Sequence, residues 1–304
     1  MRKSALILLG TTVLLSACSK PEPLPEPVRA VRTLTVAAGS ASLTHEYPAE
    51  IRARAERVVD WMARADVDVL AMQETKCSDE QFPMMTFLGA GYEVAHCGHD
   101  QWNGVAIASR VGIDNVAIGF DGQPMFGGKA EARAIGATCG GVRVWSLYVP
   151  NGRTVEDPHF RYKLDWLAAL RNNTEEWLRN DQSARIALVG DWNVAPTDED
   201  VWDIEVFRGS THVTEPERAA FSAIETSFAD VVRPFAPGPG VYTYWDYTQL
   251  RFPKKQGMRI DFILASPELA GQVVHAEIVR DERKTGKERI GSPSDHAPVF
   301  IDVN

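Results

Sequence analysis

Short apolar runs of strand length recur along the chain and are separated by polar and turn-forming residues. Runs of this kind are typical of strands that are buried on both faces. They predict strands at residues 67–72, 104–108, 142–149, 186–189, 241–245, 260–265 and 298–303. Because few helices separate these strands, we expect two packed sheets covered by helices rather than a regular parallel array.

Two segments instead show the period of an amphipathic helix. Ile51, Ala55 and Met62 lie at helical spacing, which predicts a helix that begins at Ile51 and leads into the first strand. Residues 160–178 carry leucines at three-residue spacing on one face and predict a second helix.

The first 50 residues differ from the rest in composition. Arg2 and Lys3 precede a short apolar run at residues 5–15, and small residues then lead to Cys18. This arrangement resembles a bacterial lipoprotein signal, in which Cys18 is acylated and becomes the mature N-terminus. The apolar run is too short to span a bilayer as a stable helix, and a buried N-terminal helix is the alternative interpretation.

A proline-rich segment follows this signal. Prolines at four alternate positions between residues 21 and 27 favour an extended, solvated spacer. From residue 28 the chain becomes strand-like and resembles the start of a periplasmic adaptor subunit of an efflux pump. The sequence therefore predicts a lipoprotein-type signal at residues 1–18, a tether with an adaptor-like segment at 19–50, and one large domain at 51–304.

The composition excludes several classes of protein. Of the 304 residues, 44% are hydrophobic and 24% are charged, which excludes disordered, collagen-like and polytopic membrane proteins. The formal net charge of −9 argues against a uniformly basic surface that coats nucleic acid, but it leaves a locally basic groove open. The four cysteines form no close pair of the CxxC kind, so neither a zinc site nor a redox dithiol is indicated.

Acidic and amide side chains directly follow two of the predicted strands. Glu74 stands at the end of the first strand, where a desolvated carboxylate is costly unless it is paired or binds a metal ion. Asp191 and Asn193 follow the strand at 186–189 and are two residues apart, hence on the same side of an extended chain. An ordinary surface acid at Glu74 and an Asx turn at Asp191 are the alternatives.

A histidine and two acids lie near the last two predicted strands. Asp295 and His296 are adjacent just before the strand at 298–303, so their side chains point in opposite directions on an extended chain. Asp261 lies in the strand at 260–265, and a buried aspartate beside a histidine fixes the ring and favours the imidazolium form. We therefore expect Asp261 to pair with His296, with a histidine satisfied inside the core as the alternative.

The chain contains QETK, GDWN, RIDFILAS and SDHAP in this order, each at a strand end. Together these segments resemble the endonuclease/exonuclease/phosphatase superfamily, and most closely the exodeoxyribonuclease III and class II abasic-site endonuclease family. The resemblance covers residues 51–303 and implies an α/β fold, a four-layer sandwich of two mixed β-sheets flanked by helices. It also implies phosphodiester hydrolysis on damaged duplex DNA, as a 3′-to-5′ exodeoxyribonuclease and abasic-site endonuclease of DNA repair.

The resemblance implies a metal site and a catalytic set. Glu74 would bind Mg²⁺ or Mn²⁺, with Asp295 and Asp191 as further ligands, because hard oxygen ligands suit these ions. Asp191 would also orient or deprotonate the attacking water, while Asn193 would hold the phosphate. Tyr148 would donate a hydrogen bond to the phosphate or to the leaving oxygen.

The remaining implied catalytic pair is His296 held by Asp261, which would stabilise the pentacovalent phosphorane. Spacing alone leaves open whether Asp191 or His296 is the general base.

Aromatic and basic residues between the acidic motifs are candidates for DNA contacts. Tyr244 and Trp245 would wall a pocket for a flipped abasic sugar, and Arg251 with Lys254 would hold flanking phosphates. Arg133 would contact the DNA backbone, with a surface salt bridge as the alternative. The expected partner is duplex DNA with abasic or 3′-blocked sites, and the chain is expected to be a monomer.

The start of the large domain departs from the family. Its members normally begin with a central strand that ends in an asparagine of the metal site, whereas reading back from Ile51 places Tyr47 at that position. We therefore expect the first strand to be replaced and activity to be impaired. Three functions remain open: a DNA repair nuclease, a membrane-tethered phosphodiesterase of the same superfamily, and an inactive DNA-binding fusion. Anchoring through Cys18 and a cytoplasmic nuclease predict different locations.

Overall fold

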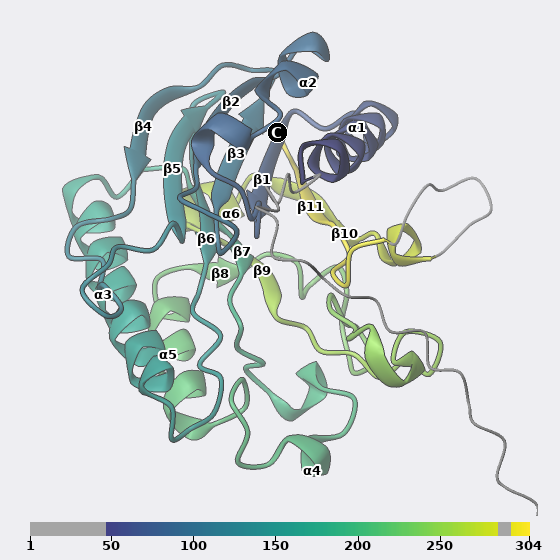
Figure 1. The fold of residues 1–304 in the computed structure, drawn as a ribbon. Coiled ribbons are helices and arrows are strands. Elements are labelled where there is room, and N and C mark those ends of the chain that lie inside the picture. The colour runs from purple at the N-terminus through teal and green to yellow at the C-terminus, as the bar shows by residue number, and fades with distance from the viewer. Residues whose placement is uncertain (1–46, 285–292) are drawn as a thin grey trace, which may run out of the picture. The chain divides into compact units, whose positions relative to one another are not determined.

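The computed structural model describes residues 47–284 and 293–304 (Figure 1). The signal and most of the tether expected at residues 1–18 and 19–50 lie outside these residues. The described residues belong to one compact unit. Within the described residues no helix combines the length and the apolar character needed to cross a membrane.

Strands of the described residues form three sheets. The largest has the order β4-β5-β6-β7-β9-β8. Its strands are β4 (Asp114–Ile118), β5 (Ala134–Cys139), β6 (Val142–Tyr148), β7 (Ile186–Asp191), β8 (Ala229–Asp230) and β9 (Asp261–Ala265). A second sheet has the order β1-β3-β2 and a third pairs β10 with β11. Their strands are β1 (Val69–Gln73), β2 (Glu93–Cys97), β3 (Val105–Ser109), β10 (Val273–Ile278) and β11 (Val299–Val303).

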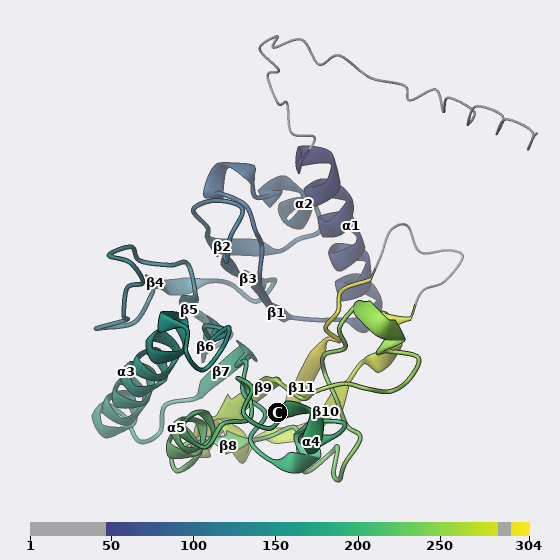
Figure 2. The ribbon, with the colours of Figure 1, turned by 60° about the horizontal axis from the view of Figure 1, so that its bottom comes forward.

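Helices cover the outer faces of these sheets. The α-helices are α1 (Tyr47–Ala65), α2 (Met84–Gly89), α3 (Pro158–Asn180), α4 (Ile204–Phe207), α5 (Glu215–Glu225) and α6 (Pro267–Ala270). Short 3₁₀ turns lie at Asp79–Gln81, Asp198–Asp200, Thr248–Leu250 and Arg280–Arg283. Figure 2 shows α3 and α5 together on one side of the large sheet, and α1 with α2 beside the small sheet of β1, β2 and β3.

The apolar residues of β3 explain the layering, because this strand is buried on both faces. Val105 and Ile107 pack with Ile135 of the large sheet. The alternate residues Ala106 and Ala108 belong to the cluster under α1 and α2. A further cluster joins the other face of the large sheet to α3 and α5. The result is four layers, helix, sheet, sheet, helix, as the sequence and the family resemblance predict.

Six of the seven predicted strands are confirmed and correspond to β1, β3, β6, β7, β9 and β11. The helix predicted at 160–178 is confirmed as α3, which begins at Pro158. The side chain of Asp157 caps it by accepting a hydrogen bond from the backbone N–H of His159 at 2.8 Å. The proline at the first helical position needs no hydrogen-bond donor there, so the start is well specified.

The strand predicted at 241–245 is wrong. Tyr244 forms only isolated bridges, with Met258 and His296. The backbone N–H groups of Thr243 and Tyr244 both donate to the carbonyl of Met258 at 2.9 Å, which no regular ladder allows. The apolar residues of this segment, Tyr242 and Trp245, instead fill a separate small core.

The helix predicted to begin at Ile51 begins four residues earlier, at Tyr47. Pro48 is compatible with this start because a proline is tolerated in the first turn of a helix. Tyr47 is therefore the first residue of a helix and not the last residue of a strand. Residues before α1 lie outside the described part of the chain, so the expectation that the first strand of the family is replaced stays a prediction.

Candidate active site

The register of the large sheet brings three candidate residues side by side. Tyr148 ends β6, Asp191 ends β7, and these two residues are paired across the parallel strands. Asp191 is also paired with Asp261, the first residue of β9, across the antiparallel neighbour. Directly paired residues of adjacent strands point to the same face of a sheet. One sheet edge therefore presents a phenol and two carboxylates on one face.

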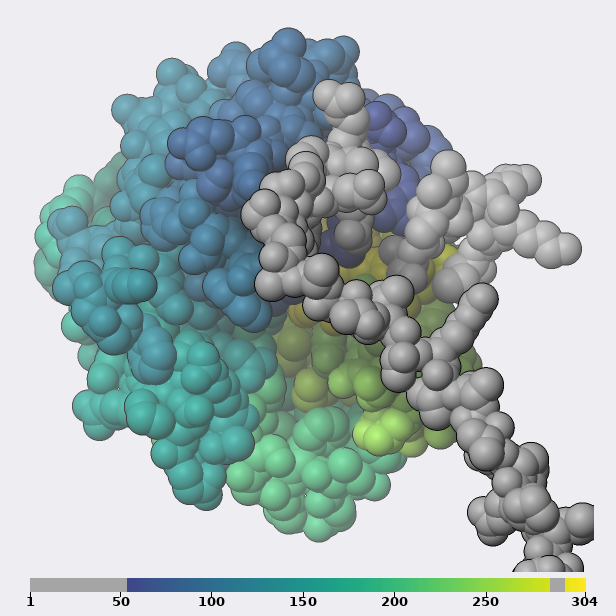
Figure 3. Space-filling model, viewed as in Figure 1, coloured from purple at the N-terminus to yellow at the C-terminus, as the bar shows by residue number. Residues whose placement is uncertain are grey.

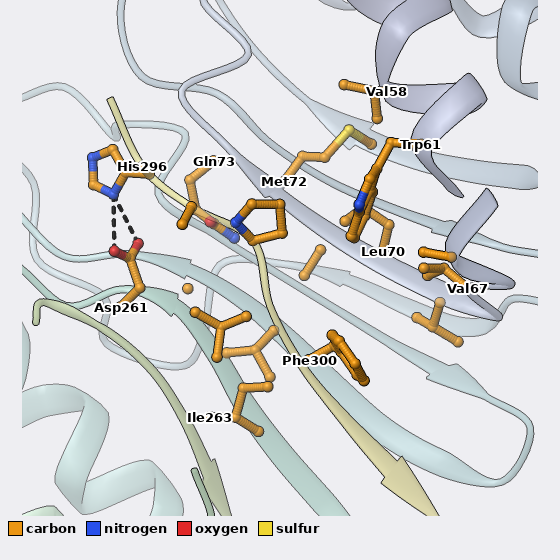
Figure 4. Close-up of a pocket in the computed structure, with 18 of the residues that line it drawn as sticks. Val58, Trp61, Val67, Leu70, Met72, Gln73, Asp261, Ile263, His296 and Phe300 are labelled. Atoms are coloured by element: carbon orange, nitrogen blue, oxygen red, sulfur yellow. Dashed lines mark hydrogen bonds and ion pairs between the residues drawn. The ribbon is translucent and has the colours of Figure 1, made fainter. Parts of the chain in front are cut away.

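His296 approaches this edge from the loop before β11. Its Nδ1 lies 2.9 and 3.0 Å from the two carboxylate oxygens of Asp261, and Figure 4 shows the two side chains facing each other. Burial alone would lower the pKa of His296, but the charges of Asp261, Asp191 and Asp295 outweigh it and raise this pKa to about 10. The imidazole is therefore protonated at neutral pH. The predicted pairing of His296 with Asp261 is present in the structure.

Asp191 is buried among these charges. Burial is the largest cause that raises its pKa, to about 7, and the carboxylates of Asp261 and Glu74 add to the shift. The cation of His296 and the backbone N–H of Asn193 act in the opposite direction. A carboxylate with a pKa near neutrality is suited to accept a proton from water.

Glu74 lies just after β1, in a left-handed backbone conformation with φ of 55°. A non-glycine residue in this region is strained, and such residues cluster at functional sites. Its carboxylate accepts hydrogen bonds from the hydroxyl of Tyr148 and from Nζ of Lys76, the latter at 2.7 Å. Burial opposes ionisation, but these two donors outweigh it and lower the pKa of Glu74.

Tyr148 stays a neutral donor. Burial and the nearby carboxylates of Glu74 and Asp191 raise the pKa of its phenol far above the ordinary value. The hydrogen bond from its hydroxyl to Glu74 thus links the end of β6 to the loop after β1.

Asn193 is more enclosed than the sequence suggests. Its backbone has a φ of 50°, and its side chain is almost fully buried. The amide nitrogen donates to Asp191 Oδ2 at 3.1 Å and to the carbonyl of Val149 at 3.0 Å. Its backbone N–H donates to Asp191 Oδ1 at 2.9 Å. In this arrangement Asn193 orients the carboxylate of Asp191.

Two further residues at this site are absent from the sequence-based set. Asn151 Nδ2 donates to Asn193 Oδ1 at 3.0 Å, and His212 Nε2 lies 3.0 Å from the same oxygen. Burial and the nearby cation of Lys163 lower the pKa of His212 to about 4, so this imidazole is neutral. Asn151 is exposed and thus available to a substrate. It lies within the segment LYVPNG, which already resembled the family, but His212 carries no signal in its sequence neighbourhood.

A buried ion pair supports this part of the site. Nζ of Lys163 in α3 pairs with the carboxylate of Glu217 in α5, and both side chains are fully buried. Lys163 also donates to the backbone carbonyl of Asn193 at 2.6 Å. Glu217 Oε1 accepts from the backbone N–H of His212 at 2.8 Å and from Thr211 Oγ1 at 2.7 Å. The pair therefore fixes the loops that carry Asn193 and His212.

The acidic residues fit a hard divalent cation. Glu74, Asp191, Asp261 and Asp295 all line one cleft of about 2150 Å³. Glu74 is ionised, and its side chain is 40% exposed. Within the described residues no group of three or more His, Cys, Asp or Glu side chains is arranged to hold a metal ion by itself. Magnesium sites commonly use one or two carboxylates, and substrate phosphate and water complete the shell, so this donor set is compatible with such an ion.

The predicted DNA contacts are placed unequally. Arg133 is 4% exposed; its Nε lies 2.5 Å from Glu131, and its guanidinium stacks 4.9 Å from the ring centre of Tyr148. Trp245 is 1% exposed within a small core. Neither side chain is accessible to DNA in this structure, because each is packed against neighbouring residues inside the fold. The alternative of a salt bridge at Arg133 fits the structure, although the pair is buried.

The other three predicted contacts lie closer to the surface. The ring of Tyr244 packs 4.9 Å from that of His296, centre to centre. Arg251 stacks over Trp202 at 5.1 Å, and Lys254 is exposed. Tyr247, a further aromatic residue of this segment, is 57% exposed and donates a hydrogen bond from its hydroxyl to the carbonyl of Pro293 at 2.7 Å. Tyr244 thus lines the site, and Tyr247 and Lys254 border it at the surface.

Comparisons with known proteins agree with this geometry. Residues 38–296 match the Endonuclease/Exonuclease/phosphatase family. Exodeoxyribonuclease III from Haemophilus influenzae is 29% identical over 265 residues, which cover 83% of this chain and 96% of that protein. An AP endonuclease structure from Archaeoglobus fulgidus is 34% identical with a TM-score of 0.76, covering 84% of this chain and 95% of that one. The 3′ phosphatase NExo from Neisseria, solved with a product DNA hairpin, is 31% identical with a TM-score of 0.77 and the same coverage.

The four-layer α/β fold and the acids, histidine and tyrosine at one sheet edge define a hydrolase that acts on phosphodiesters, as the matched proteins are. The chain belongs to the Endonuclease/Exonuclease/phosphatase family.

Proposed function

We propose that the chain is a divalent-metal-dependent phosphodiesterase of DNA repair, with abasic-site endonuclease and 3′-to-5′ exodeoxyribonuclease activity. The observation that carries the proposal is the convergence of Tyr148, Asp191 and the Asp261–His296 pair on one sheet edge beside Glu74. Relatives named as an exodeoxyribonuclease III and an AP endonuclease support DNA as the substrate.

Glu74 and Asp295 would hold the cation, which we propose to be Mg²⁺ or Mn²⁺, with Asp191 at the border of its shell. When bound, such an ion supplies charge neutralisation on the phosphate and on the leaving oxygen. Tyr148 and Lys76 keep the carboxylate of Glu74 ionised and fixed in position. The two proposed metal ligands therefore come from the end of β1 and from the loop before β11.

The protein's own groups would do the remaining chemistry. Asp191, with a pKa near 7 and a carboxylate oriented by Asn193, accepts the proton of the attacking water. The imidazolium of His296, held by Asp261, donates a hydrogen bond to the negative charge that builds up on the phosphate. Asn151, exposed at the same edge, is placed to donate to a phosphate oxygen, the role that the sequence assigned to Asn193.

The DNA-binding role now falls to a smaller set of residues. Tyr244 beside His296 and the exposed ring of Tyr247 provide flat apolar surfaces for a sugar or base displaced from the stack. Lys254 and Arg251 supply positive charge nearby. We propose these four as the DNA contacts.

The test is incision of an abasic duplex by the full chain with Mg²⁺, with Mn²⁺ and with chelator. We expect metal-dependent incision that the chelator abolishes. Asp191→Asn and His296→Ala should each raise the barrier by roughly 2 to 4 kcal/mol while the circular dichroism spectrum is unchanged. Asp114→Asn, an exposed acid on β4, is the matched control and should keep the parent rate. Undiminished incision in chelator, or a parent-like rate of either variant, would refute the corresponding assignment.

The residues before α1 give a separate proposal about location. We propose that residues 1–18 are a lipoprotein-type signal, that residues 19–50 are a tether, and that Cys18 is the acylated residue. Expression of the full chain in a bacterium with labelled fatty acid should label the parent and not the Cys18→Ser variant. Equal labelling of both proteins would contradict the proposal, and its failure would leave the nuclease assignment untouched.

A further inference from the structure

The residues on either side of Thr75 face the candidate active site, whereas Thr75 itself does not. Glu74 and Lys76 line the cleft of about 2150 Å³, and Thr75 is not among the residues that line it. Glu74 and Lys76 both have a left-handed backbone conformation, with φ of 55° and 52°. This conformation is costly for residues other than glycine, so a turn with two such residues persists only where its surroundings hold it.

A chain of hydrogen bonds holds the side chain of Thr75 from behind. Its Oγ1 lies 2.8 Å from Nε2 of His96, and Nδ1 of His96 lies 2.8 Å from Oδ1 of Asp79. A carboxylate can only accept, so Nδ1 carries the ring proton and donates the hydrogen bond to Asp79. Burial lowers the pKa of His96, although the charge of Asp79 opposes this, so the ring is neutral at neutral pH. Nε2 therefore accepts a hydrogen bond from the hydroxyl of Thr75.

The imidazole of His96 has little freedom to move. Its side chain is 2% exposed, and the ring stacks on Phe82 with 4.2 Å between the ring centres. Oδ1 of Asp79 also accepts from the backbone N–H of Gly98 at 2.8 Å, which fixes the carboxylate. A Cβ at Gly98 would lie 2.6 Å from Cε1 of His96, so the backbone packs directly against the ring. A ring held in this way can hold Thr75 in turn.

Backbone hydrogen bonds join the same turn to the loop before β3. The N–H of Thr75 donates to the carbonyl of Gly104 at 3.2 Å, and that of Lys76 donates to the carbonyl of Asn103 at 2.9 Å. Gly104 has a φ of +93°, and a Cβ there would lie 2.1 Å from Oγ1 of Thr75. The hydroxyl of Thr75 thus fills the place of a side chain at Gly104. In the space-filling view the blue surface that includes these segments lies on the same face as the yellow C-terminal surface (Figure 3).

We propose that His96 is a positioning residue of the candidate active site, which holds Glu74 through the hydroxyl of Thr75. The hydrogen bond to Thr75 keeps the left-handed turn formed and the carboxylate of Glu74 in the cleft. The inference rests on the proposed function, because that function makes Glu74 a metal ligand. Groups that orient metal ligands commonly contribute about ten- to a hundredfold to metal affinity. Loss of this chain should therefore weaken metal binding before it affects the chemical step.

The test measures Mn²⁺ binding by the full chain at pH 7.5 without DNA, from the electron paramagnetic resonance signal of free Mn²⁺. His96→Phe keeps the ring and its stacking on Phe82 but removes both nitrogens, and Thr75→Val keeps the branched shape but removes the hydroxyl. Each should raise the dissociation constant for Mn²⁺ at least about tenfold. Thr75→Ser keeps the hydroxyl and should bind Mn²⁺ like the parent. His275→Phe, which changes an exposed histidine beside two phenylalanines, is the matched control and should also bind like the parent.

Hydrogen exchange gives a readout that does not need the metal. The amides of Thr75 and Lys76 should exchange faster in His96→Phe and in Thr75→Val than in the parent. The amides of residues 106–108 in β3 are the internal control and should exchange at the parent rate. A merely structural role of His96 would lower the urea midpoint and leave both the Mn²⁺ affinity of the folded protein and the exchange at Thr75 unchanged.

The outcomes separate this inference from the proposed function. Mn²⁺ binding and abasic incision by the parent, with parent-like Mn²⁺ binding by His96→Phe and Thr75→Val, would overturn the inference and leave the proposed function standing. Failure of Thr75→Ser to bind like the parent, or unchanged exchange at Thr75 and Lys76, would also overturn the inference alone. A parent that neither binds Mn²⁺ nor incises an abasic duplex would overturn both.

Discussion

Asp261→Asn tests the electrostatics of the site, because one carboxylate raises the pKa of two catalytic groups. The oxygens of Asp261 lie 2.9 and 3.0 Å from His296 Nδ1, and its charge also contributes to the raised pKa of Asp191. Asparagine keeps the size and the planar shape but not the charge. We expect the pKa of His296 to fall from about 10 towards the ordinary value of 6.5.

The size of the effect follows from the population of imidazolium. At pH 8.5 a histidine with a pKa of about 10 is almost fully protonated, whereas one with an ordinary pKa is only about 1% protonated. The expected loss at pH 8.5 is therefore about 100-fold, or about 2.7 kcal/mol. At pH 6 roughly three quarters of an ordinary histidine is protonated, so the same variant should be within a few-fold of the parent.

The sign of the pH dependence is fixed by the two shifts. Activity needs Asp191 deprotonated and His296 protonated, so the parent rate should rise through about pH 7 and fall through about pH 10. The falling limb, which reports His296, should move to lower pH in Asp261→Asn. The assay is single-turnover incision of an abasic duplex at saturating Mg²⁺. The pH is varied between 5.5 and 9.5, because an ordinary histidine changes its charge within this range. Equal rates at pH 8.5, or a profile parallel to that of the parent, would refute the reasoning.

Two further predictions concern stability. Glu217→Gln leaves the buried Lys163 without its counter-charge and should lower the free energy of unfolding by about 3 to 5 kcal/mol in urea, whereas Glu205→Gln, in an exposed pair with Arg208, should leave the urea midpoint almost unchanged. Gly190→Ala should also lower the urea midpoint, because φ at this position is +139° and a Cβ there would collide with the carbonyl oxygen of Leu147; an unchanged midpoint would show that β7 relaxes at no cost.

The sequence was most informative where an apolar run stops at a polar residue. Glu74 and Asp191 stand at such points, Asp261 stands where an apolar run begins, and the strands beside them are present at nearly the predicted positions. The rule fails for 241–245, because its apolar residues fill a small core without joining a ladder. It also passes over strands with weak patterns, such as β4, an exposed edge strand, and β10, whose side chains are mostly exposed or half-buried.

The buried polar residues that support the site could not be predicted from the sequence. Lys163 lies between Tyr162 and Leu164 on α3 and has no sequence feature that distinguishes it from a surface lysine, yet it is fully buried. Glu217 has the spacing of a capping-box residue after Thr214, and it does cap α5, but its second role as the partner of Lys163 depends on how α3 packs against α5. Contacts of this kind join segments more than 50 residues apart, and no local pattern encodes them.

The identity of the general base shows why residue type alone was insufficient. Spacing left Asp191 and His296 as equal candidates. We propose that electrostatics separates them, because like charges close together push neighbouring groups towards different protonation states. Asp261, Asp191 and Asp295 keep His296 protonated, so it has no free lone pair with which to accept a proton. The same crowding raises the pKa of the buried Asp191 to about 7, while the donors Lys76 and Tyr148 lower that of Glu74. The carboxylates of Asp191, at the end of β7, and of Glu74, just after β1 of the other sheet, thus differ in pKa. We therefore propose Asp191 as the proton acceptor and Glu74 as the charged metal ligand. For Asp191 this role depends on the register of β7 and β9, which pairs it with Asp261.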